Sequence, residues 1–382
     1  MTPPYTQLKD QILYRVPPAS IITGNSVIVC LVLLLCCINI QLQGQSLGSE
    51  FVYGDLLPDA PELAERGIYS VGVRTIDLVH KEQVDILNYT KDSDSLYDRT
   101  LKVEVWYPAD IPKETRHMVT YNDHMGNANS MDRPLIPFTF SGRAVRNSKP
   151  YLGQGPYPLI IVSHGYTGSR YLFTYLTENL ASKGYIVASI GHTESTFQDA
   201  GGFNSTLLNR SLDVIFVLNQ LADLAEKNGS FLARMVNAEL TALIGYSMGG
   251  YGVLNVVGAG YSPEAAQLFS TMSNGSQALQ KRVTGNPVFE ASIDPRIKAV
   301  VAMAPWGMER AVWNQQGLEG IEIPCLFIAG SEDDISGYEK GIKAIYEGAV
   351  NSNRYLLTYI NARHNIAPNP PPMESFQPGL HP

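Results

Sequence analysis

Short apolar runs alternate with stretches of helical periodicity through the second half of the chain. Continuous apolar runs of this length are expected of strands that are buried on both faces. The predicted strands are Leu159–Ser163, Tyr185–Ile190, Leu240–Ile244, Ile297–Met303, Pro324–Ala329 and Arg354–Ile360. The predicted helices between them are Arg170–Ser182, Leu207–Glu226, Gly249–Val257 and Tyr338–Ala349. This alternation predicts an α/β domain with a mostly parallel central sheet and helices on both faces.

Two segments do not follow this alternation. Residues 108–156 are polar and rich in Gly and Pro, and we expect surface loop with little regular structure there. Residues 260–295 are rich in Gly, Ser and Asn and interrupt the pattern before the sixth core strand. We interpret them as an insertion near the carboxyl ends of the strands and as a candidate lid. Earlier in the chain, Val71–Val79 and Leu101–Tyr107 have the Val and Ile content of two further strands.

An apolar run near the N-terminus bears on where the protein is located relative to the cell membrane. Val27–Ile40 is apolar apart from Asn39, and no Asp, Glu, Lys or Arg occurs between residues 16 and 49. A spanning helix needs about 20 apolar residues, so this shorter run favours a cleaved signal peptide, with an uncleaved anchor or a buried core helix as alternatives. The first two predict a secreted or periplasmic domain, or a membrane-anchored exported one. The predicted division is 1–45 signal or anchor, 46–69 lead-in, 70–370 catalytic domain and 371–382 Pro-rich tail.

Composition narrows the functional classes. Of the 382 residues, 45% are hydrophobic and 17% charged, which excludes a disordered chain. The net charge is −8 and there is no Lys/Arg-rich block, so we expect no nucleic-acid partner. Three of the four cysteines, Cys30, Cys36 and Cys37, lie in the N-terminal run, which leaves Cys325 in a predicted strand and excludes a zinc–cysteine site. No metal, nucleotide or flavin motif is present, and we expect no cofactor.

A candidate nucleophile lies between a predicted strand and a predicted helix. Residues 245–249 read Gly-Tyr-Ser-Met-Gly, the pattern G-x-S-x-G, with Ser247 at its centre. In this context the pattern is typical of a sharp turn that exposes the serine hydroxyl at a helix N-terminus. The helix dipole favours the negative charge that develops there during acyl transfer. The sequence therefore predicts that Ser247 is a catalytic nucleophile.

A serine needs a base and an acid, which follow it in this kind of sheet. His364 directly follows the last predicted strand and is the predicted base, because His381 lies in the Pro-rich tail. The loop after Pro324–Ala329 contains three carboxylates in a row, Glu332, Asp333 and Asp334. We favour Asp333 as the acid, with Asp334 and Glu332 as alternatives.

Two backbone N–H groups are needed to stabilise the oxyanion. One is expected from Met248, and the second from Tyr166 in the loop after Leu159–Ser163, where Gly165 permits a close approach. For His164 in the same loop, we favour a structural hydrogen bond over a role as base. The segment 191–194, Gly-His-Thr-Glu, is interpreted as a structural turn, with a place in the site as the alternative.

Together these motifs resemble a known superfamily. The motifs are Ser163-His-Gly-Tyr-Thr-Gly168, Gly245-Tyr-Ser-Met-Gly-Gly250, Ala304-Pro-Trp306, Gly330-Ser-Glu-Asp333 and Ala362-Arg-His364. They resemble the α/β-hydrolase superfamily, and within it the dienelactone-hydrolase-like branch that includes platelet-activating-factor-acetylhydrolase-like proteins and bacterial cutinases. The resemblance implies an α/β-hydrolase fold, with Tyr166 and Met248 in the oxyanion hole and Gly165 beside the substrate. It also implies that Trp306 flanks the acyl site, although a buried core tryptophan is the alternative.

The resulting hypothesis is a secreted serine hydrolase that cleaves carboxylic esters of short or medium acyl chain through an acyl-enzyme. Its partner would be a small-molecule or polymer ester, and it would meet a membrane only through an N-terminal anchor. The alternatives are an amidase or peptidase with the same three residues, or a non-catalytic hydrolase-like binding protein. One departure favours the last alternative. Related folds place a helix after the catalytic histidine, whereas six of the 18 residues after His364 are proline.

Overall fold

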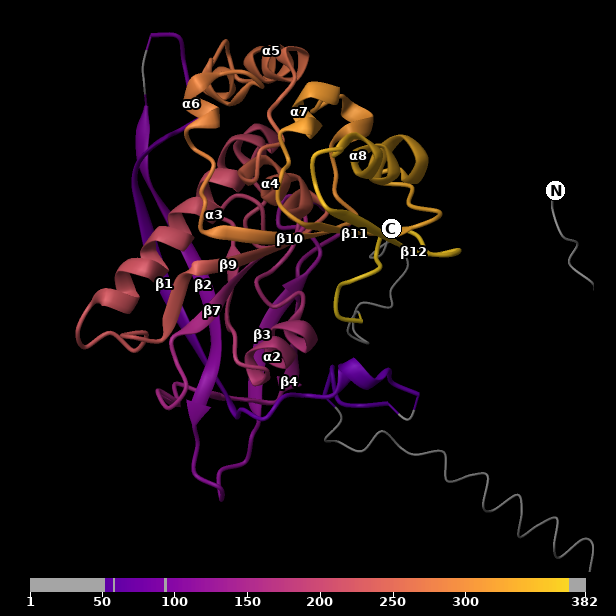
Figure 1. Ribbon diagram of the computed structural model, residues 1–382. Coiled ribbons are helices and arrows are strands. Elements are labelled where there is room, and N and C mark those ends of the chain that lie inside the picture. The colour runs from indigo at the N-terminus through magenta and orange to yellow at the C-terminus, as the bar shows by residue number, and fades with distance from the viewer. Residues whose placement is uncertain (1–51, 58, 93–94, 371–382) are drawn as a thin grey trace, which may run out of the picture. The chain divides into compact units, whose positions relative to one another are not determined.

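The computed structural model describes residues 52–57, 59–92 and 95–370 (Figure 1). The predicted signal or anchor segment and the whole predicted Pro-rich tail, which includes His381, lie outside the described residues. Within the described part of the chain, no helix has the length and hydropathy needed to cross a membrane.

A mixed sheet forms the centre of the described domain. Its longer strands are β1 Val71–Val84, β2 Leu96–Asp110, β7 Tyr157–Ser163, β8 Ile186–Gly191, β9 Val236–Tyr246, β10 Ile297–Met303, β11 Cys325–Gly330 and β12 Arg354–Tyr359. They lie in the order β1-β2-β8-β7-β9-β10-β11-β12. The strands from β8 to β12 in this order pair in parallel, whereas β2 pairs antiparallel with β1 and β8. The predicted mostly parallel sheet is confirmed.

Helices cover the sheet from both sides (Figure 1). The α-helices of the described residues are α2 Thr174–Ser182, α3 Phe203–Glu226, α4 Met248–Val256, α5 Pro263–Met272, α6 Pro287–Glu290, α7 Gln315–Glu319 and α8 Lys343–Gly348. Helix α2 lies on one face, and α3, α4 and α8 lie on the other. The helix predicted to begin at Arg170 begins four residues later, and the one predicted at Tyr338 begins with a π-helical turn, Tyr338–Ile342, before α8.

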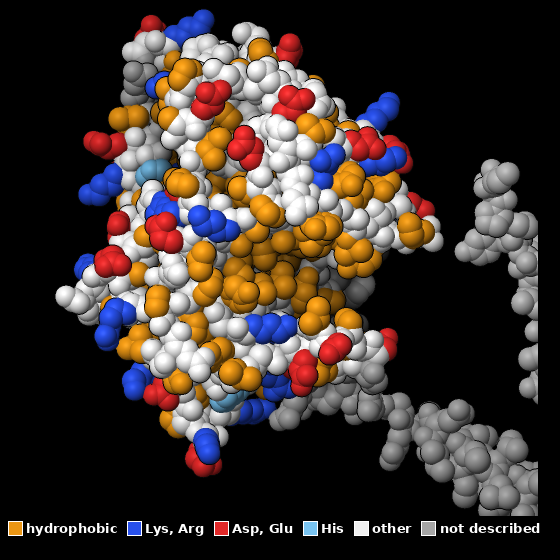
Figure 2. Space-filling model, viewed as in Figure 1, with side chains coloured by type: hydrophobic (Ala, Val, Ile, Leu, Met, Phe, Trp, Pro, Cys, Tyr) orange, Lys and Arg blue, Asp and Glu red, His pale blue; other side chains and the backbone are white. Residues whose placement is uncertain are grey.

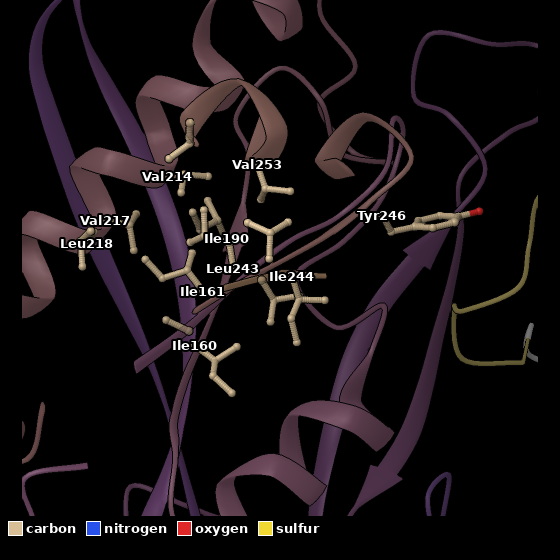
Figure 3. Close-up of a cluster of buried hydrophobic side chains, with 14 of the residues drawn as sticks. Ile160, Ile161, Ile190, Val214, Val217, Leu218, Leu243, Ile244, Tyr246 and Val253 are labelled. Atoms are coloured by element: carbon tan, nitrogen blue, oxygen red, sulfur yellow. The ribbon is translucent and has the colours of Figure 1, made fainter. Parts of the chain in front are cut away.

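The core lies between the middle strands and the helices α3 and α4 (Figure 3). Ile161 of β7 and Leu243 of β9 point toward Val214 of α3 and Val253 of α4, and all four are fully buried. The neighbouring Ile160 points to the opposite face, as the period of two along a strand requires. Burial on both faces explains why these strands are apolar without interruption.

The expectation of loop across residues 108–156 is wrong. This segment contains a separate hairpin, β3 Val119–Met125 and β4 Ile136–Gly142, and two short strands, β5 Ala144–Arg146 and β6 Lys149–Pro150, that pair with β1 and β2. The hairpin buries Tyr121 completely, and the hydroxyl of Tyr121 accepts a hydrogen bond from Trp106 Nε1 and donates one to Glu178. A few buried aromatic side chains therefore order a mostly polar stretch.

The insertion at 260–295 lies between α4 and β10, before the sixth core strand, as predicted. It contains α5, a 3-10 turn Ala278–Arg282 and α6. It is bonded to neighbouring parts of the chain: Asn274 Nδ2 donates to the Tyr89 carbonyl, and Ser262 Oγ donates to the Ala311 carbonyl. The first bond holds the insertion against the loop between β1 and β2, and the second holds it against the segment that follows β10.

One part of the sheet carries exposed apolar side chains. On β12, Tyr355, Leu357 and Tyr359 alternate with half-buried neighbours and are 60%, 44% and 48% exposed. Figure 2 shows hydrophobic side chains gathered in a hollow between the region of α2 and the region of β10–β12. Among the described residues after His364, none is helical, so no described helix packs over β12 on this side.

Candidate active site

Ser247 lies in the sharp turn between β9 and α4. Its backbone has φ 53° and ψ −115°, in the positive-φ region that non-glycine residues rarely adopt. Two hydrogen bonds hold it there: Ser247 N–H donates to the Met303 carbonyl, and Trp306 N–H donates to the Ser247 carbonyl. The end of β10 and the residues after it thus fix the nucleophile turn from both sides.

Glycines allow this turn to form. A Cβ at Gly249 would lie 1.9 Å from the Ser163 carbonyl oxygen, and one at Gly245 would lie 2.3 Å from the Gly249 oxygen. A side chain at either position would collide with backbone atoms, which cannot move aside as a flexible side chain can. The two glycines of G-x-S-x-G are therefore required by close packing around Ser247.

The structure brings the three predicted catalytic residues together. Ser247 Oγ lies 3.0 Å from His364 Nε2, and His364 Nδ1 lies 2.9 Å from one carboxylate oxygen of Asp333 and 3.1 Å from the other. All three residues are at most 9% exposed. The Asp333 contact implies that Nδ1 carries the proton, which leaves Nε2 free to accept the proton of the serine hydroxyl.

Close packing of two loops holds Asp333 against His364. At Gly330, a Cβ would lie 2.3 Å from the carbonyl oxygens of both Ala362 and Arg363, so the histidine loop lies directly on this glycine. Burial by itself would raise the pKa of Asp333. However, hydrogen bonds from His364 and from the N–H groups of Ser336 and Ile335 hold this pKa below its ordinary value. Asp333 is therefore an anion at neutral pH.

The two competing carboxylates point elsewhere. Asp334 is exposed and forms an ion pair with the Arg363 side chain. Glu332 is also exposed, and its backbone N–H donates to the Ala362 carbonyl. Of the three carboxylates in the loop, Asp333 alone contacts His364 in the structure.

The two expected oxyanion donors flank Ser247. Met248 is the first residue of α4, and Gly165 lies so close to the nucleophile that a Cβ there would be 3.3 Å from Ser247 Cβ. The backbone N–H groups of Met248 and Tyr166 donate no hydrogen bond to another described residue. Both donors are thus available to a bound oxyanion.

Trp306 is half-buried and lines a cavity of about 320 Å³ beside the nucleophile turn. Phe203 connects the two regions, because its ring packs edge-on against both Trp306 and Tyr166. The insertion supplies much of the remaining wall through Ala265, Leu268, Phe269 and Met272. Sequence reasoning missed these wall residues, and apart from the placement of the insertion near the strand ends no motif indicates them.

We call residues 164–168, which follow β7, the oxyanion loop. A second Ser–His–Asp set lies beneath this loop. His192 Nδ1 contacts Asp213 at 2.8 Å, and His192 Nε2 contacts Ser163 Oγ at 2.8 Å. Arg99 donates two hydrogen bonds to the same carboxylate, at 2.8 and 3.0 Å. His164 is also fully buried and hydrogen-bonded within its loop, which agrees with the structural role expected for it. Within the described residues, no group of three or more His, Cys, Asp or Glu could hold a metal.

Family comparisons agree with this geometry. Residues 67–205 match the family model described as platelet-activating factor acetylhydrolase, isoform II, and residues 148–269 match the model described as PET hydrolase-like. Together the two matched segments include β1, the oxyanion loop and the nucleophile turn.

Individual relatives are more distant. Cutinase est1 of Thermobifida alba is 24% identical over 213 residues, which are 56% of this chain and 55% of that protein. Cutinase 2 of Thermobifida cellulosilytica is 22% identical over 215 residues, which are 56% of this chain and 63% of that protein. The chain thus spans less than two thirds of the length of either relative. A solved ferulic acid esterase from Streptomyces cinnamoneus is 21% identical with a TM-score of 0.45, over 79% of this chain and 74% of that one.

The strand order, the nucleophile turn and the two family matches lead to the same assignment. Each of the sequence motifs that carried the resemblance lies at the carboxyl ends of the strands, where this fold places its reacting groups. The chain has an α/β-hydrolase fold and resembles the platelet-activating factor acetylhydrolases and the cutinases.

Proposed function

We propose that this protein is a serine hydrolase that cleaves carboxylic esters through an acyl-enzyme. The observation that carries the proposal is the hydrogen-bonded series Ser247–His364–Asp333, buried at the carboxyl end of the sheet. A serine hydroxyl becomes a useful nucleophile when a neutral imidazole accepts its proton and a carboxylate orients that imidazole. The cutinase relatives support the choice of an ester as substrate.

In the proposed reaction, Ser247 Oγ adds to the ester carbonyl carbon while its proton moves to His364 Nε2. The carbonyl oxygen becomes an oxyanion and accepts hydrogen bonds from the N–H groups of Tyr166 and Met248. His364 then gives the proton to the leaving alcohol oxygen, the C–O bond breaks, and the acyl group remains on Ser247. Water, deprotonated by His364, releases the acid and restores the serine.

A fluorophosphonate probe tests this proposal directly. We expect covalent labelling of the wild-type protein at Ser247, located by mass spectrometry of the labelled peptide, and no labelling of Ser247→Ala. Folded wild-type protein that does not react would favour a non-catalytic binding protein. Turnover of anilides with rates comparable to those of p-nitrophenyl esters would instead favour an amidase.

We further propose that short or medium acyl chains are preferred. The cavity beside Trp306 has a volume of about 320 Å³, at the small end of the about 300–1,000 Å³ typical of small-molecule sites. Side chains of α5, among them Leu268 and Met272, form part of its wall. The expected result is a maximum of kcat/KM at short or medium chains in a series from acetate to palmitate. A steady rise through palmitate would contradict this and indicate a lipase.

A further inference from the structure

A continuous chain of buried hydrogen bonds leads from Asp213 on α3 to the oxyanion loop. We propose that His164, held in turn by His192 and Asp213, positions the backbone N–H of Tyr166 for the oxyanion. The inference rests on the proposed function, since it assigns a role within that reaction. His164 and His192 act through other groups and are positioning residues.

The hydrogen bonds of His164 determine which ring nitrogen carries its proton. The backbone N–H of His192 donates to His164 Nε2 at 3.2 Å, so Nε2 is an acceptor and the proton is on Nδ1. His164 Nδ1 then donates to the Gly165 carbonyl oxygen at 2.6 Å. Burial, together with the nearby Arg210, holds the pKa of His164 well below its ordinary value, so the ring remains neutral. Nδ1 is therefore a donor at neutral pH.

This bond to Gly165 fixes the direction of the Tyr166 N–H. The Gly165 carbonyl and the Tyr166 N–H belong to one peptide unit, which is trans and planar, so the two groups point in opposite directions. Rotation of this unit would carry the N–H away from its present direction and replace it with the carbonyl oxygen. An oxygen there would repel the oxyanion. Holding the carbonyl of Gly165 is thus equivalent to aiming the donor of Tyr166.

The other residues of this hydrogen-bond chain hold His164 in place. His192 is 1% exposed, and its two ring nitrogens contact Asp213 and Ser163. Asp213 is an anion held by Arg99, and its hydrogen bond fixes the His192 ring. In addition, Arg210 Nη1 donates to the His164 carbonyl at 2.6 Å. The oxyanion loop is therefore anchored to α3 through both its backbone and its side chains.

The buried Ser163–His192–Asp213 set is not a second reaction centre. All three residues are at most 1% exposed, so no substrate reaches Ser163. Ser163 is the last residue of β7 and directly precedes His164. From this position the three residues support the oxyanion loop.

Two substitutions at His164 separate positioning from packing. His164→Asn retains a side-chain N–H near the place of Nδ1, whereas His164→Leu keeps comparable bulk and removes the donor. For His164→Leu we expect kcat for a p-nitrophenyl ester to fall by about 10²-fold with KM changed less than threefold, the lower range for loss of one oxyanion donor. The affinity for a trifluoromethyl ketone, which forms a charged tetrahedral adduct with Ser247, should fall by the same factor. His164→Asn should restore most of both quantities.

A histidine outside this chain serves as the matched control. His117 is half-buried between β2 and β3 and lines a different cavity, together with Asp55 and Arg66. We expect His117→Leu to leave kcat and the ketone affinity unchanged while thermal unfolding records its effect on stability. If His164→Leu does not fold, Ser163→Ala replaces it in the same measurements. This milder variant removes only the hydroxyl that contacts His192 Nε2.

Crystal structures of the folded variants test the inference without any turnover. We expect the Gly165–Tyr166 peptide to be rotated or disordered in His164→Leu and to keep its direction in His164→Asn. An unchanged peptide in His164→Leu overturns the inference, whatever the activity. Equal losses in KM and kcat, or no rescue by Asn, would also overturn it. Failure of wild-type labelling at Ser247 would instead reject the proposed function, and the two failures are thus distinguishable.

Discussion

Backbone strain at a single residue is the local signature of this site. Ser247 has a positive φ, and such positions store about 1–3 kcal/mol unless glycine occupies them. Hydrogen bonds from Ser247 to Met303 and from Trp306 to Ser247 over-determine the conformation. The strain places the hydroxyl beside His364 rather than against the helix, which is where the proposed chemistry needs it.

At the residue scale, the first prediction concerns Ser247 and His364. Because His364 Nε2 lies 3.0 Å from Ser247 Oγ, each residue is useful only with the other. Replacing either by Ala should reduce kcat for ester hydrolysis by a factor on the order of 10⁶, and the double variant should be little worse than either single one. Clearly additive losses in the double variant would mean that the two residues do not act together.

The second prediction separates two adjacent carboxylates. Asp333→Asn should lower kcat by about 10⁴-fold, because an amide in place of the carboxylate favours the wrong histidine tautomer. Asp334→Asn removes only an exposed ion pair with Arg363 and should retain most of the activity. Steady-state kinetics of the two variants at saturating ester decides between them, and a crippled Asp334→Asn enzyme would reverse the assignment.

At the scale of strands and helices, the sequence predicts best what is buried on both faces. The strands β7 to β12 were predictable within a few residues because apolar runs such as Leu159–Ser163 have no polar interruption. The site motifs were predictable for a related reason, since turns at strand ends need particular residues. Gly330 and Gly249 lie against backbone atoms of neighbouring loops, where no side chain fits. Such contacts appear in the sequence as glycines at particular places in a motif.

Features that depend on partners distant in sequence were not predictable. The strand β3 alternates apolar and polar residues only over its first four positions, which is too short a pattern to predict a strand. Tyr121 also gives no sign that Trp106 and Glu178 will bond to it. The cavity wall likewise combines Phe203 of α3 with Met272 of α5, which no local pattern relates. These residues meet only after the sheet has formed.

The insertion permits a third prediction. Ala265 of α5 lines the cavity, so Ala265→Leu should shorten it and move the maximum of kcat/KM toward shorter acyl chains. Each methylene excluded from the cavity should reduce kcat/KM by about fourfold, the equivalent of about 0.8 kcal/mol. The measurement is kcat/KM for p-nitrophenyl esters of increasing chain length.

Gln267→Leu is the matched control for this variant. Gln267 also belongs to α5 but is exposed and does not line the cavity. Its chain-length profile should coincide with that of the wild type. A profile for Ala265→Leu that is also unchanged would show that the acyl chain binds elsewhere.

For the whole molecule, the fourth prediction concerns stability in acid. Burial and the neighbouring Arg210 lower the pKa of His192 to about 3, and the pKa of His164 is also held well below its ordinary value. In the unfolded chain both titrate near pH 6.5. Below that pH the unfolded chain binds protons that the folded protein does not, so stability is full above about pH 6.5 and decreases as the pH falls.

The slope of this loss is measurable. Each buried histidine contributes up to about 1.4 kcal/mol per pH unit between pH 6.5 and its folded pKa. Urea unfolding at a series of pH values should show the decline in the wild type. His192→Gln should be less stable than the wild type at neutral pH. Its free energy of unfolding should fall less steeply with pH, by about the contribution of one buried histidine. Stability independent of pH from 8 to 5 would contradict the burial of these rings.

The fifth prediction concerns the exposed side chains of β12. Lysine on an edge strand opposes association between molecules, so Leu357→Lys should reduce binding of a hydrophobic dye and raise the concentration at which the protein aggregates. Activity per folded molecule should be unchanged. The adjacent Leu356 packs on the core, and Leu356→Lys should instead lower the melting temperature. Equal dye binding by wild type and Leu357→Lys would mean that the dye binds to another surface.

If the proposed ester substrate is a solid polymer, the apolar face of β12 would separate adsorption from cleavage. A hydrophobic solid attracts any exposed apolar surface, and the side chains of Tyr355, Leu357 and Tyr359 project from the sheet face, whereas Ser247 lies at the strand ends. Molecules attached through this face would present their reacting serine sideways to the material. The amount of protein bound per unit area would then exceed the number of molecules positioned to cleave an ester. A variant that adsorbs less would in that case degrade the solid faster.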